Sequence, residues 1–249
     1  MSGSRPRWRG RVFVAIMLML TLLFAGLGAW QWQRLGEKQT EIAAIAARMR
    51  QPPSELPTVA DWPGLRATDL DYRPVTIRGE FAPEQTVLVF TSLAEPRGRY
   101  GGPGYWLMTP FALETGGTIF VNRGFIPQAS RDTFARGGGA APGLQVLRGI
   151  ARRSEEPGAF TPAADAVGRV DWVRNVTRLA RLADPALAPF APVYVDLPAG
   201  EPGALPQGGE TILTLPNNHL GYALTWFGFA LLTPILLAFW LRRQRRDGA

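Results

Sequence analysis

Two long runs of uncharged residues lie at the two ends of this 249-residue chain and constrain its fold most strongly. Residues 12–33 hold ten Val, Ile, Leu or Phe, and residues 220–241 hold eleven Leu, Ile or Phe. Each run has 22 residues, enough for a helix to cross the ~30 Å hydrocarbon core of a bilayer. Apolar side chains at ~0.3–0.6 kcal/mol each favour insertion. The sequence therefore predicts two transmembrane helices, with Pro234 bending the second rather than ending it.

Arginine clusters flank both runs on their outer sides. The clusters consist of Arg5, Arg7, Arg9, Arg11, Arg242, Arg243, Arg245 and Arg246. Because Lys and Arg beside membrane helices stay in the cytoplasm, we expect cytoplasmic tails at 1–11 and 242–249. Residues 34–219 then form a domain on the opposite side of the membrane. No Ser-rich, acid-poor transit peptide precedes the first run, which favours a bacterial inner membrane and a periplasmic domain.

A cleaved signal peptide is the alternative interpretation of the first run. Gly26 and Gly28 place small residues where a signal peptidase cleaves. The apolar run is longer than the hydrophobic region of such a peptide, and Trp30 and Trp32 suit the membrane interface. We therefore expect a retained anchor.

Composition excludes several classes of function. The chain carries a net charge of +7, but residues 34–219 hold 19 basic and 19 acidic side chains, so the excess lies in the tails. A nucleic-acid-binding protein needs a basic surface on its folded domain, so we expect no nucleic acid partner. The absence of Cys excludes disulfides, thiolate metal sites and Cys nucleophiles.

The central residues have the pattern of an antiparallel sheet. After a helical stretch at 34–50 that ends before Pro52 and Pro53, Gly and Pro separate short β-branched or aromatic runs; residues 34–219 hold 41 Gly and Pro. The predicted strands are 75–81, 86–91, 105–113, 118–125, 144–150, 193–197 and 211–215. A hairpin joins the third and fourth of these through residues 114–117.

Two further segments complete the predicted architecture. Residues 171–183 show helical spacing, and residues 130–142 are typical of a loop. The fold class is an α+β membrane protein, in which two transmembrane helices bracket an antiparallel β-rich, barrel-like domain with one or two helices. Strand order and barrel closure stay open.

A search for catalytic motifs gives no support for an enzyme. The chain has one His and lacks HExxH, GxSxG and GxxxxGK[ST] motifs. The glycines at 98–104 lack the spacing of a dinucleotide-binding loop, so we expect a tight loop there. The carboxylate pairs at 69 and 71 and at 155 and 156 lie in polar stretches, where solvated surface charges are the expected role.

His219 is the one residue with ligand chemistry in an informative place. It follows two asparagines and directly precedes the second run, so we expect it near the outer membrane surface at a helix N-terminus. That position disfavours the imidazolium, and neutral imidazole is the form that binds a metal or haem iron. Tyr222 and Trp226 would project on roughly the same face and flank a flat ligand. The alternative is that all three are interfacial and capping residues.

Five blocks of this sequence are more specific than hydropathy requires: GAWQWQRLGEK at 28–38, YRPVTIRGEF at 72–81, GPGYWLMTPF at 102–111, VNRGFIP at 121–127 and NNHLGYALTWFGFA at 217–230. Together they resemble the Surfeit-locus (Shy-type) protein family, whose members assist assembly of cytochrome c oxidase. The last block is the most specific, because generic hydrophobicity does not generate Asn-Asn-His before a terminal span.

The resemblance implies a role in delivering haem a to oxidase subunit I, or in retaining it there. In bacterial members of the family the histidine of the Asn-Asn-His block is implicated in haem binding, and His219 occupies that place, so the resemblance implies that His219 binds the haem iron. Trp30, Gln31 and Arg34 would complete the pocket from the first span. Other oxidase assembly or haem a synthesis proteins and the lipid bilayer are the remaining expected partners.

Arg123 has two interpretations, pairing with a haem propionate or fixing a turn through backbone carbonyls. Two positions depart from the family pattern, because Phe125 replaces a Trp and Asn175 replaces an acidic residue. The alternative functions are a cofactor-free scaffold for an oxidase subunit and a generic tethered periplasmic binding module. A haem spectrum of the purified protein separates the first interpretation from the scaffold.

Overall fold

The computed structural model describes residues 7–210 and 217–247, which fall into two compact units. One unit contains the two terminal helices, and the other spans Ile45–Ile212. The predicted strand at 211–215 lies outside the described residues. The compact β-rich unit thus begins about ten residues after the predicted start of the extramembrane domain, because the first helix continues beyond its apolar run.

Both predicted terminal helices are present. Helix α1 spans Arg7–Met49 and helix α5 spans His219–Asp247, so α1 joins the first apolar run to the helical stretch predicted at 34–50. Helix α5 continues through Pro234, as predicted. Only 6% and 11% of their most apolar windows are buried, so these helices expose apolar surface that a soluble core helix would cover. Both are long and apolar enough to cross a membrane.

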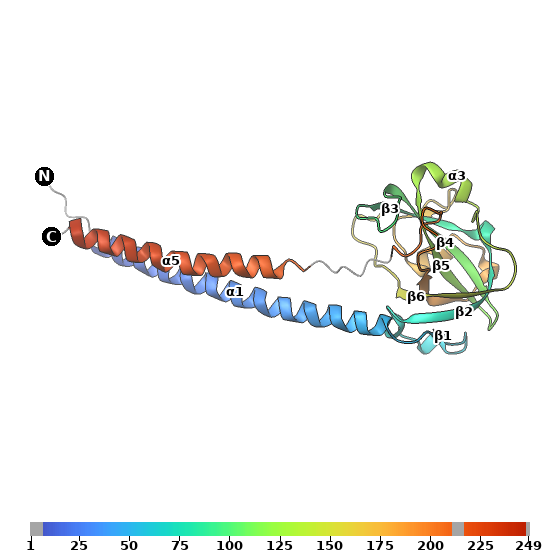
Figure 1. Ribbon diagram of the computed structural model, residues 1–249, viewed down its shortest axis with the longest axis horizontal. Helices are drawn as coiled ribbons and strands as arrows, with labels where there is room; N and C mark the ends of the chain where they lie inside the picture. The colour runs from blue at the N-terminus through green and yellow to red at the C-terminus, as the bar shows by residue number, and fades with distance from the viewer. Residues whose placement is uncertain (1–6, 211–216, 248–249) are drawn as a thin grey trace. The chain divides into compact units, whose positions relative to one another are not determined.

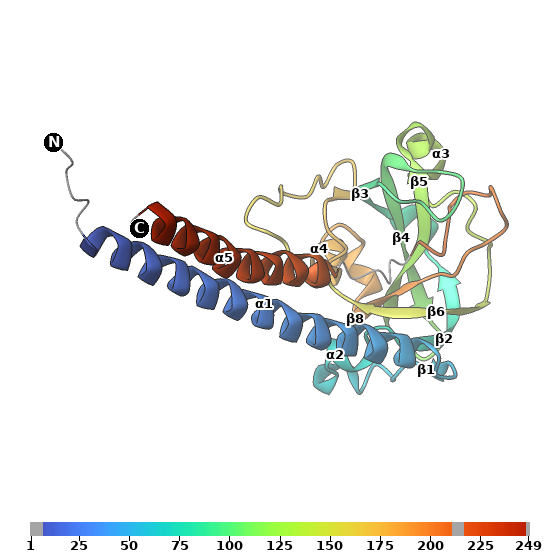
Figure 2. The same ribbon diagram turned by 60° about the vertical axis from the view of Figure 1, so that its left-hand side comes forward.

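The two helices pack side by side and antiparallel (Figure 1, Figure 2). At one end of the pair the rings of Phe13 and Trp240 lie 4.6 Å apart, and further along Phe24 contacts Trp226 and Phe229 at 5.7 and 5.5 Å. Residue numbers in these contacts rise along α1 as they fall along α5, which is the pattern of an antiparallel pair. Small residues allow the close approach, which is typical of packed helices in membranes.

The β-rich unit contains eight strands in one sheet. Their bounds are β1 Ser54–Glu55, β2 Pro74–Phe81, β3 Val87–Leu93, β4 Gly102–Leu113, β5 Thr118–Pro127, β6 Gln145–Arg153, β7 Val170–Asp171 and β8 Phe190–Asp196. Six of these confirm the predicted strands that lie in the described residues. The two-residue strands β1 and β7 were not predicted.

Five of the strands close into a barrel. The order β2-β6-β8-β5-β4 returns to β2 because residues 79–81 pair with residues 111–113 of β4. Gly79 permits this closure, since a Cβ there would fall 1.9 Å from the carbonyl oxygen of Ala112. The predicted β4–β5 hairpin is confirmed. The sheet is not purely antiparallel, because β5 pairs with β8 in parallel, as β1 does with β2 and β7 with β3.

Alternation along the strands fills the barrel interior with apolar side chains. Phe111, Ile119, Val121 and Val193 are fully buried in one cluster. On the other face of the same strands, a second cluster lies under helix α4 (Val176–Ala180). Strands β4 and β5 are therefore buried on both faces, which explains their nearly continuous apolar sequences.

The predicted helix at 171–183 is shorter in the structure. Asp171 belongs to β7, and α4 begins only after Asn175, whose side chain accepts a hydrogen bond from the backbone N–H of Arg178. That N-cap fixes the start of the helix. The predicted loop at 130–142 instead starts with a short helix, α3, at Arg131–Phe134. The remaining short helices are η1 Trp62–Gly64, α2 Ala67–Leu70, η2 Pro83–Gln85, η3 Gln128–Ser130 and η4 Pro185–Leu187.

Candidate functional site

His219 contacts Gln31 across the helix pair. The imidazole Nδ1 lies 2.7 Å from the amide Oε1 of Gln31, although 188 positions separate the two residues. Gln31 is 9% exposed, so its amide is held within the helix interface. The second ring nitrogen, Nε2, has no hydrogen-bond partner among the described residues. The structure thus brings together two of the predicted site residues and leaves one imidazole nitrogen available as a donor to a metal.

Asn217 carries a second unsatisfied group two residues before His219. Its Oδ1 is buried and accepts no hydrogen bond from the described part of the chain. A buried acceptor without a donor costs ~1–3 kcal/mol. A donor to this atom would remove that cost.

Trp226 and Tyr222, the two predicted ligand contacts on α5, have different surroundings. Trp226 stacks on Phe24 at 5.7 Å with an interplanar angle of 21°, and so takes part in helix packing. Tyr222 is 57% exposed. The face of α5 toward α1 carries His219 and Ala223 at helical spacing, and Ala223 is completely buried. Tyr222 therefore stays a predicted ligand contact, reached from the exposed side of the helix.

Trp30 and Arg34 also point away from the helix interface. Trp30 is 53% exposed, and Arg34 forms an exposed ion pair with Glu37 at 2.7 Å. A surface pair of this kind contributes at most ~1 kcal/mol, so it leaves the guanidinium available to another anion. Both residues lie within one turn of Gln31 on α1 and remain predicted contacts of a bound ligand.

Arg123 lies in the β-rich unit, where its guanidinium donates hydrogen bonds to backbone carbonyls. Nη1 donates to Gly137 at 2.9 Å and Nη2 donates to Gly138 at 3.1 Å, and the group lies 5.5 Å from the centre of the Phe81 ring. Burial lowers the pKa of Arg123 to about 10. Of its two interpretations, the contacts match the one in which Arg123 fixes a turn. The structure gives no support to a propionate contact.

The donors present fit a haem better than a bare metal ion. No group of three or more His, Cys, Asp or Glu that could hold an ion occurs among the described residues. A bare ion needs several protein ligands, whereas a porphyrin supplies four nitrogens and needs only an axial donor from the protein. One imidazole with a free Nε2 meets that requirement.

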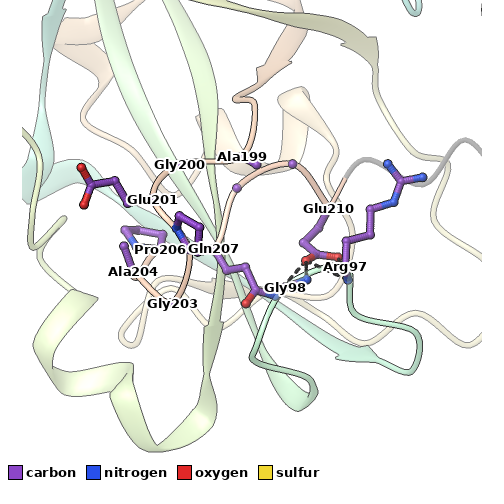
Figure 3. A pocket seen from close by; sticks show the side chains of 13 residues that line it. Arg97, Gly98, Ala199, Gly200, Glu201, Gly203, Ala204, Pro206, Gln207 and Glu210 are labelled. Carbon is purple, nitrogen blue, oxygen red and sulfur yellow. Dashed lines mark hydrogen bonds between the residues drawn. The ribbon is translucent and has the colours of Figure 1, made fainter.

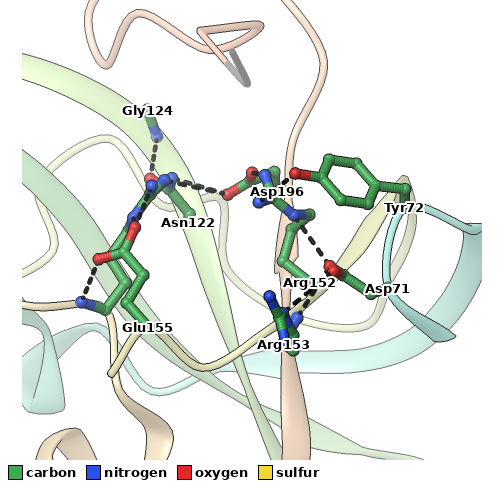
Figure 4. A network of polar contacts seen from close by, with 9 residues as sticks. Asp71, Tyr72, Asn122, Gly124, Arg152, Arg153, Glu155 and Asp196 are labelled. Carbon is green, nitrogen blue, oxygen red and sulfur yellow. Dashed lines mark hydrogen bonds and ion pairs between the residues drawn. The ribbon is translucent and has the colours of Figure 1, made fainter. Parts of the chain in front are cut away.

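A buried polar network in the β-rich unit is the largest feature that sequence reasoning missed (Figure 4). Asp196 accepts from Asn122 Nδ2 at 2.8 Å and pairs with Arg152 at 3.5 Å. Asp71 pairs with Arg152 at 3.2 Å and with Arg153 at 3.4 Å. The expectation that Asp71 is a solvated surface charge is therefore wrong, since it is 8% exposed.

Glu155 extends the same region through Arg174. The backbone N–H and Nε of Arg174 each donate to the Glu155 carboxylate at 2.9 Å, and Nη2 also contacts it. Burial opposes ionisation of Glu155, but the charge and hydrogen bonds of Arg174 outweigh it, so the pKa of Glu155 is lowered. Glu155 is thus an ion-pair residue rather than the solvated charge expected. Its partner Arg174 gave no local signal in the sequence.

The glycine-containing loop near residue 98 is occupied by a carboxylate of the chain itself (Figure 3). Glu210 accepts from the backbone N–H of Arg97 and Gly98 at 2.9–3.1 Å, and Gln207 donates to it at 2.8 Å. The Gln207 amide also pairs with both backbone groups of Tyr100. Arg97, Gly98, Gln207 and Glu210 border a cavity of about 350 Å³. Because Glu210 takes the loop's backbone donors, they do not form a phosphate site, which agrees with the predicted structural role.

Comparison with known proteins covers both units. Residues 18–231 match the model of the SURF1 family. The SURF1-like protein of Monosiga brevicollis is 32% identical over 96% of this chain and 90% of its own. Surfeit locus protein 1 of Homo sapiens is 31% identical over 93% of this chain and 77% of its own, and the SURF1-like protein of Drosophila melanogaster is 31% identical over 91% and 76%. The matched range includes both Gln31 and His219.

Proposed function

Because this chain belongs to the SURF1 family, we propose that it is an assembly factor for haem-copper cytochrome c oxidase. In this role it binds haem a and assists its delivery to subunit I or its retention there. It is not an enzyme in this proposal, since the cofactor is cargo. The observation that carries the proposal is the His219–Gln31 contact, which leaves one imidazole nitrogen free at the start of a membrane-type helix.

The ligand-binding residues of the proposal lie on the two terminal helices. His219 binds the iron through Nε2, and Trp30, Arg34 and Tyr222 offer exposed aromatic and cationic groups within one turn of the His219–Gln31 pair. An exposed indole or phenol can cover a porphyrin face, and a guanidinium can pair with a propionate. Trp226 supports the site indirectly by packing on Phe24.

The location that we propose is a bacterial inner membrane, with both termini cytoplasmic and the β-rich unit in the periplasm. The arginine clusters outside the two apolar runs support this orientation. Subunit I of the oxidase, other assembly or haem a synthesis proteins and the lipid bilayer are the partners. The relatives named above are eukaryotic, so the bacterial inner membrane is a part of this proposal that they do not supply.

Absorption spectroscopy of the full chain purified from cells that make haem a tests this function. We expect a haem spectrum in the wild type, its loss in His219→Ala, and its retention in Asn218→Ala, which changes an exposed neighbour. An unaltered haem content in His219→Ala would exclude His219 as the ligand. If the purified wild-type protein is colourless, and cells that lack it still lose the oxidase complex, the cofactor-free scaffold is supported instead.

A further inference from the structure

The His219–Gln31 hydrogen bond specifies which imidazole nitrogen carries the proton. The amide Oε1 of Gln31 only accepts hydrogen bonds, so Nδ1 of His219 must be the donor in the 2.7 Å contact. A neutral imidazole with its proton on Nδ1 has a lone pair on Nε2. The free imidazole of histidine in water favours the opposite tautomer, with the proton on Nε2. Gln31 therefore holds the ring in its less common neutral form.

We propose that Gln31 is a positioning residue that fixes the tautomer and orientation of His219, so that Nε2 faces outward as the iron donor. This inference deepens the proposed function and depends on it for the identity of the ligand. The partner of the second ring nitrogen commonly sets the orientation and basicity of a metal-binding histidine. An amide oxygen in that place makes the imidazole a stronger donor than an unbonded ring, and a carboxylate would strengthen it further.

The packing of the two helices holds both residues of the pair in place. Gln31 lies one turn from Gly28, where a Cβ would fall 2.6 Å from the ring of Phe227, so the helices are close at this level. His219 lies one turn from Ala223, which is completely buried. Both residues of the pair thus lie where the two helices are closely packed.

Other side chains of α1 near this level do not offer the same contact. Trp30 and Trp32 are 53% and 57% exposed, and Arg34 pairs with Glu37. Gln33 has the same amide group, but its Nε2 donates to Glu37 at 3.0 Å on the exposed surface. Gln33 therefore serves as a matched control for Gln31.

The first test needs no haem. The chain contains one His, so ¹⁵N-histidine labelling of the full protein in detergent micelles gives a single imidazole to assign. At about pH 8.5, we expect the Nδ1–H tautomer in the wild type and in Gln33→Leu. In Gln31→Leu we expect the Nε2–H tautomer to predominate. An Nε2–H tautomer in the wild type, or no change in Gln31→Leu, would overturn the inference.

The second test uses the haem-loaded protein. In the ferrous form, resonance Raman spectroscopy measures the iron–histidine stretching frequency, which rises with the donor strength of the imidazole. We expect a lower frequency and a 10–100-fold weaker affinity in Gln31→Leu, a higher frequency in Gln31→Glu, and wild-type values in Gln33→Leu. Equal frequencies in all four proteins would refute the role of Gln31.

The two tests separate the inference from the proposed function. If His219→Ala keeps its haem while labelling shows the Gln31-dependent tautomer, the iron assignment fails and the positioning of His219 by Gln31 holds. If His219→Ala loses haem while Gln31→Leu changes neither tautomer nor frequency, the proposed function holds and the inference fails.

Discussion

Gly28 lies directly against the ring of Phe227, and a Cβ at position 28 would fall 2.6 Å from two of its carbons. Gly26, two residues earlier on the same helix, has no atom within 4 Å of the corresponding position. The two glycines therefore differ in role, since only Gly28 sets the separation of α1 and α5. Membrane helices use small residues in this way to bring their backbones together.

We predict that Gly28→Leu separates the two helices and weakens their packing by about 1–3 kcal/mol. Because the chain has no Cys, two introduced cysteines on exposed positions of α1 and α5 can be spin-labelled without background. Pulsed electron–electron double resonance should show a longer distance between the two spin labels in Gly28→Leu. Gly26→Leu should keep the wild-type distance, and equal lengthening in both variants would refute the assignment.

The Glu155–Arg174 pair predicts a loss of stability in acid. The folded pKa of Glu155 lies below its ordinary value of 4.5, so the unfolded chain binds a proton at higher pH than the folded one. The pair therefore stabilises the fold above about pH 4.5, and this contribution is lost as the pH falls through the folded pKa. Denaturant unfolding of the full chain in detergent, measured from about pH 6 to about pH 3, should show this decrease.

Glu155→Gln should flatten that decrease, because it removes the titrating carboxyl. The neighbouring exposed Glu156 provides the control, since it has no ion-pair partner among the described residues. Glu156→Gln should follow the wild-type curve. If Glu155→Gln and the wild type lose stability in parallel, another group is responsible.

Because the buried hydroxyl of Tyr194 has no partner among the described residues, we predict that its removal does not destabilise the fold. Tyr194 is completely buried, its Oη has no hydrogen-bond partner in the described residues, and burial raises its pKa. Tyr194→Phe keeps the ring beside Arg174, at 5.7 Å, and removes an unsatisfied polar atom. We expect the free energy of unfolding to rise by about 1 kcal/mol.

Tyr72→Phe is the comparison for this hydroxyl, because Tyr72 Oη accepts a hydrogen bond from Arg152 at 3.2 Å. Removing that acceptor should lower the free energy of unfolding by ~1 kcal/mol. A loss of stability in Tyr194→Phe as large as that in Tyr72→Phe would show that a buried water satisfies the Tyr194 hydroxyl.

Glu210 predicts a local effect on the loop between β3 and β4. Glu210→Ala removes the acceptor for the backbone N–H of Arg97 and Gly98, so we expect a loss of about 1–3 kcal/mol and faster amide exchange at residues 97–100. Glu201→Ala, an exposed residue beside the same cavity, should change stability by less than ~0.5 kcal/mol. Exchange unchanged in Glu210→Ala would contradict the role of this carboxylate.

The helices and main strands were predictable because their signals are local. Runs of 22 uncharged residues and β-branched segments between Gly and Pro need no knowledge of tertiary contacts. The helix predicted at 171–183 was too long because Asp171 pairs with Arg178 at 2.7 Å and its strand pairs with β3. Tertiary pairing outweighed helical spacing there.

The sequence pointed to the residues of the candidate site on the terminal helices, but it did not predict the contacts between them. His219 and Gln31 each lie in a block that carries the family resemblance, but only the packing of α1 on α5 brings them within 2.7 Å. Asp71 was expected to be a surface charge, because nothing local shows that it meets Arg152 of β6, which also pairs with Asp196 of β8. Burial of these charges is a property of the closed sheet.

Closure of that sheet rests on a short seam. The strands β2 and β4 meet over three residue pairs, and one of the six residues is Gly79, which has no side chain to pack. The other junctions around the ring, such as β2–β6 with six pairs, are longer. When thermal motion opens the barrel, β2 and β4 should separate before any other pair of strands. The apolar interior beside Gly79 would then be exposed to solvent first.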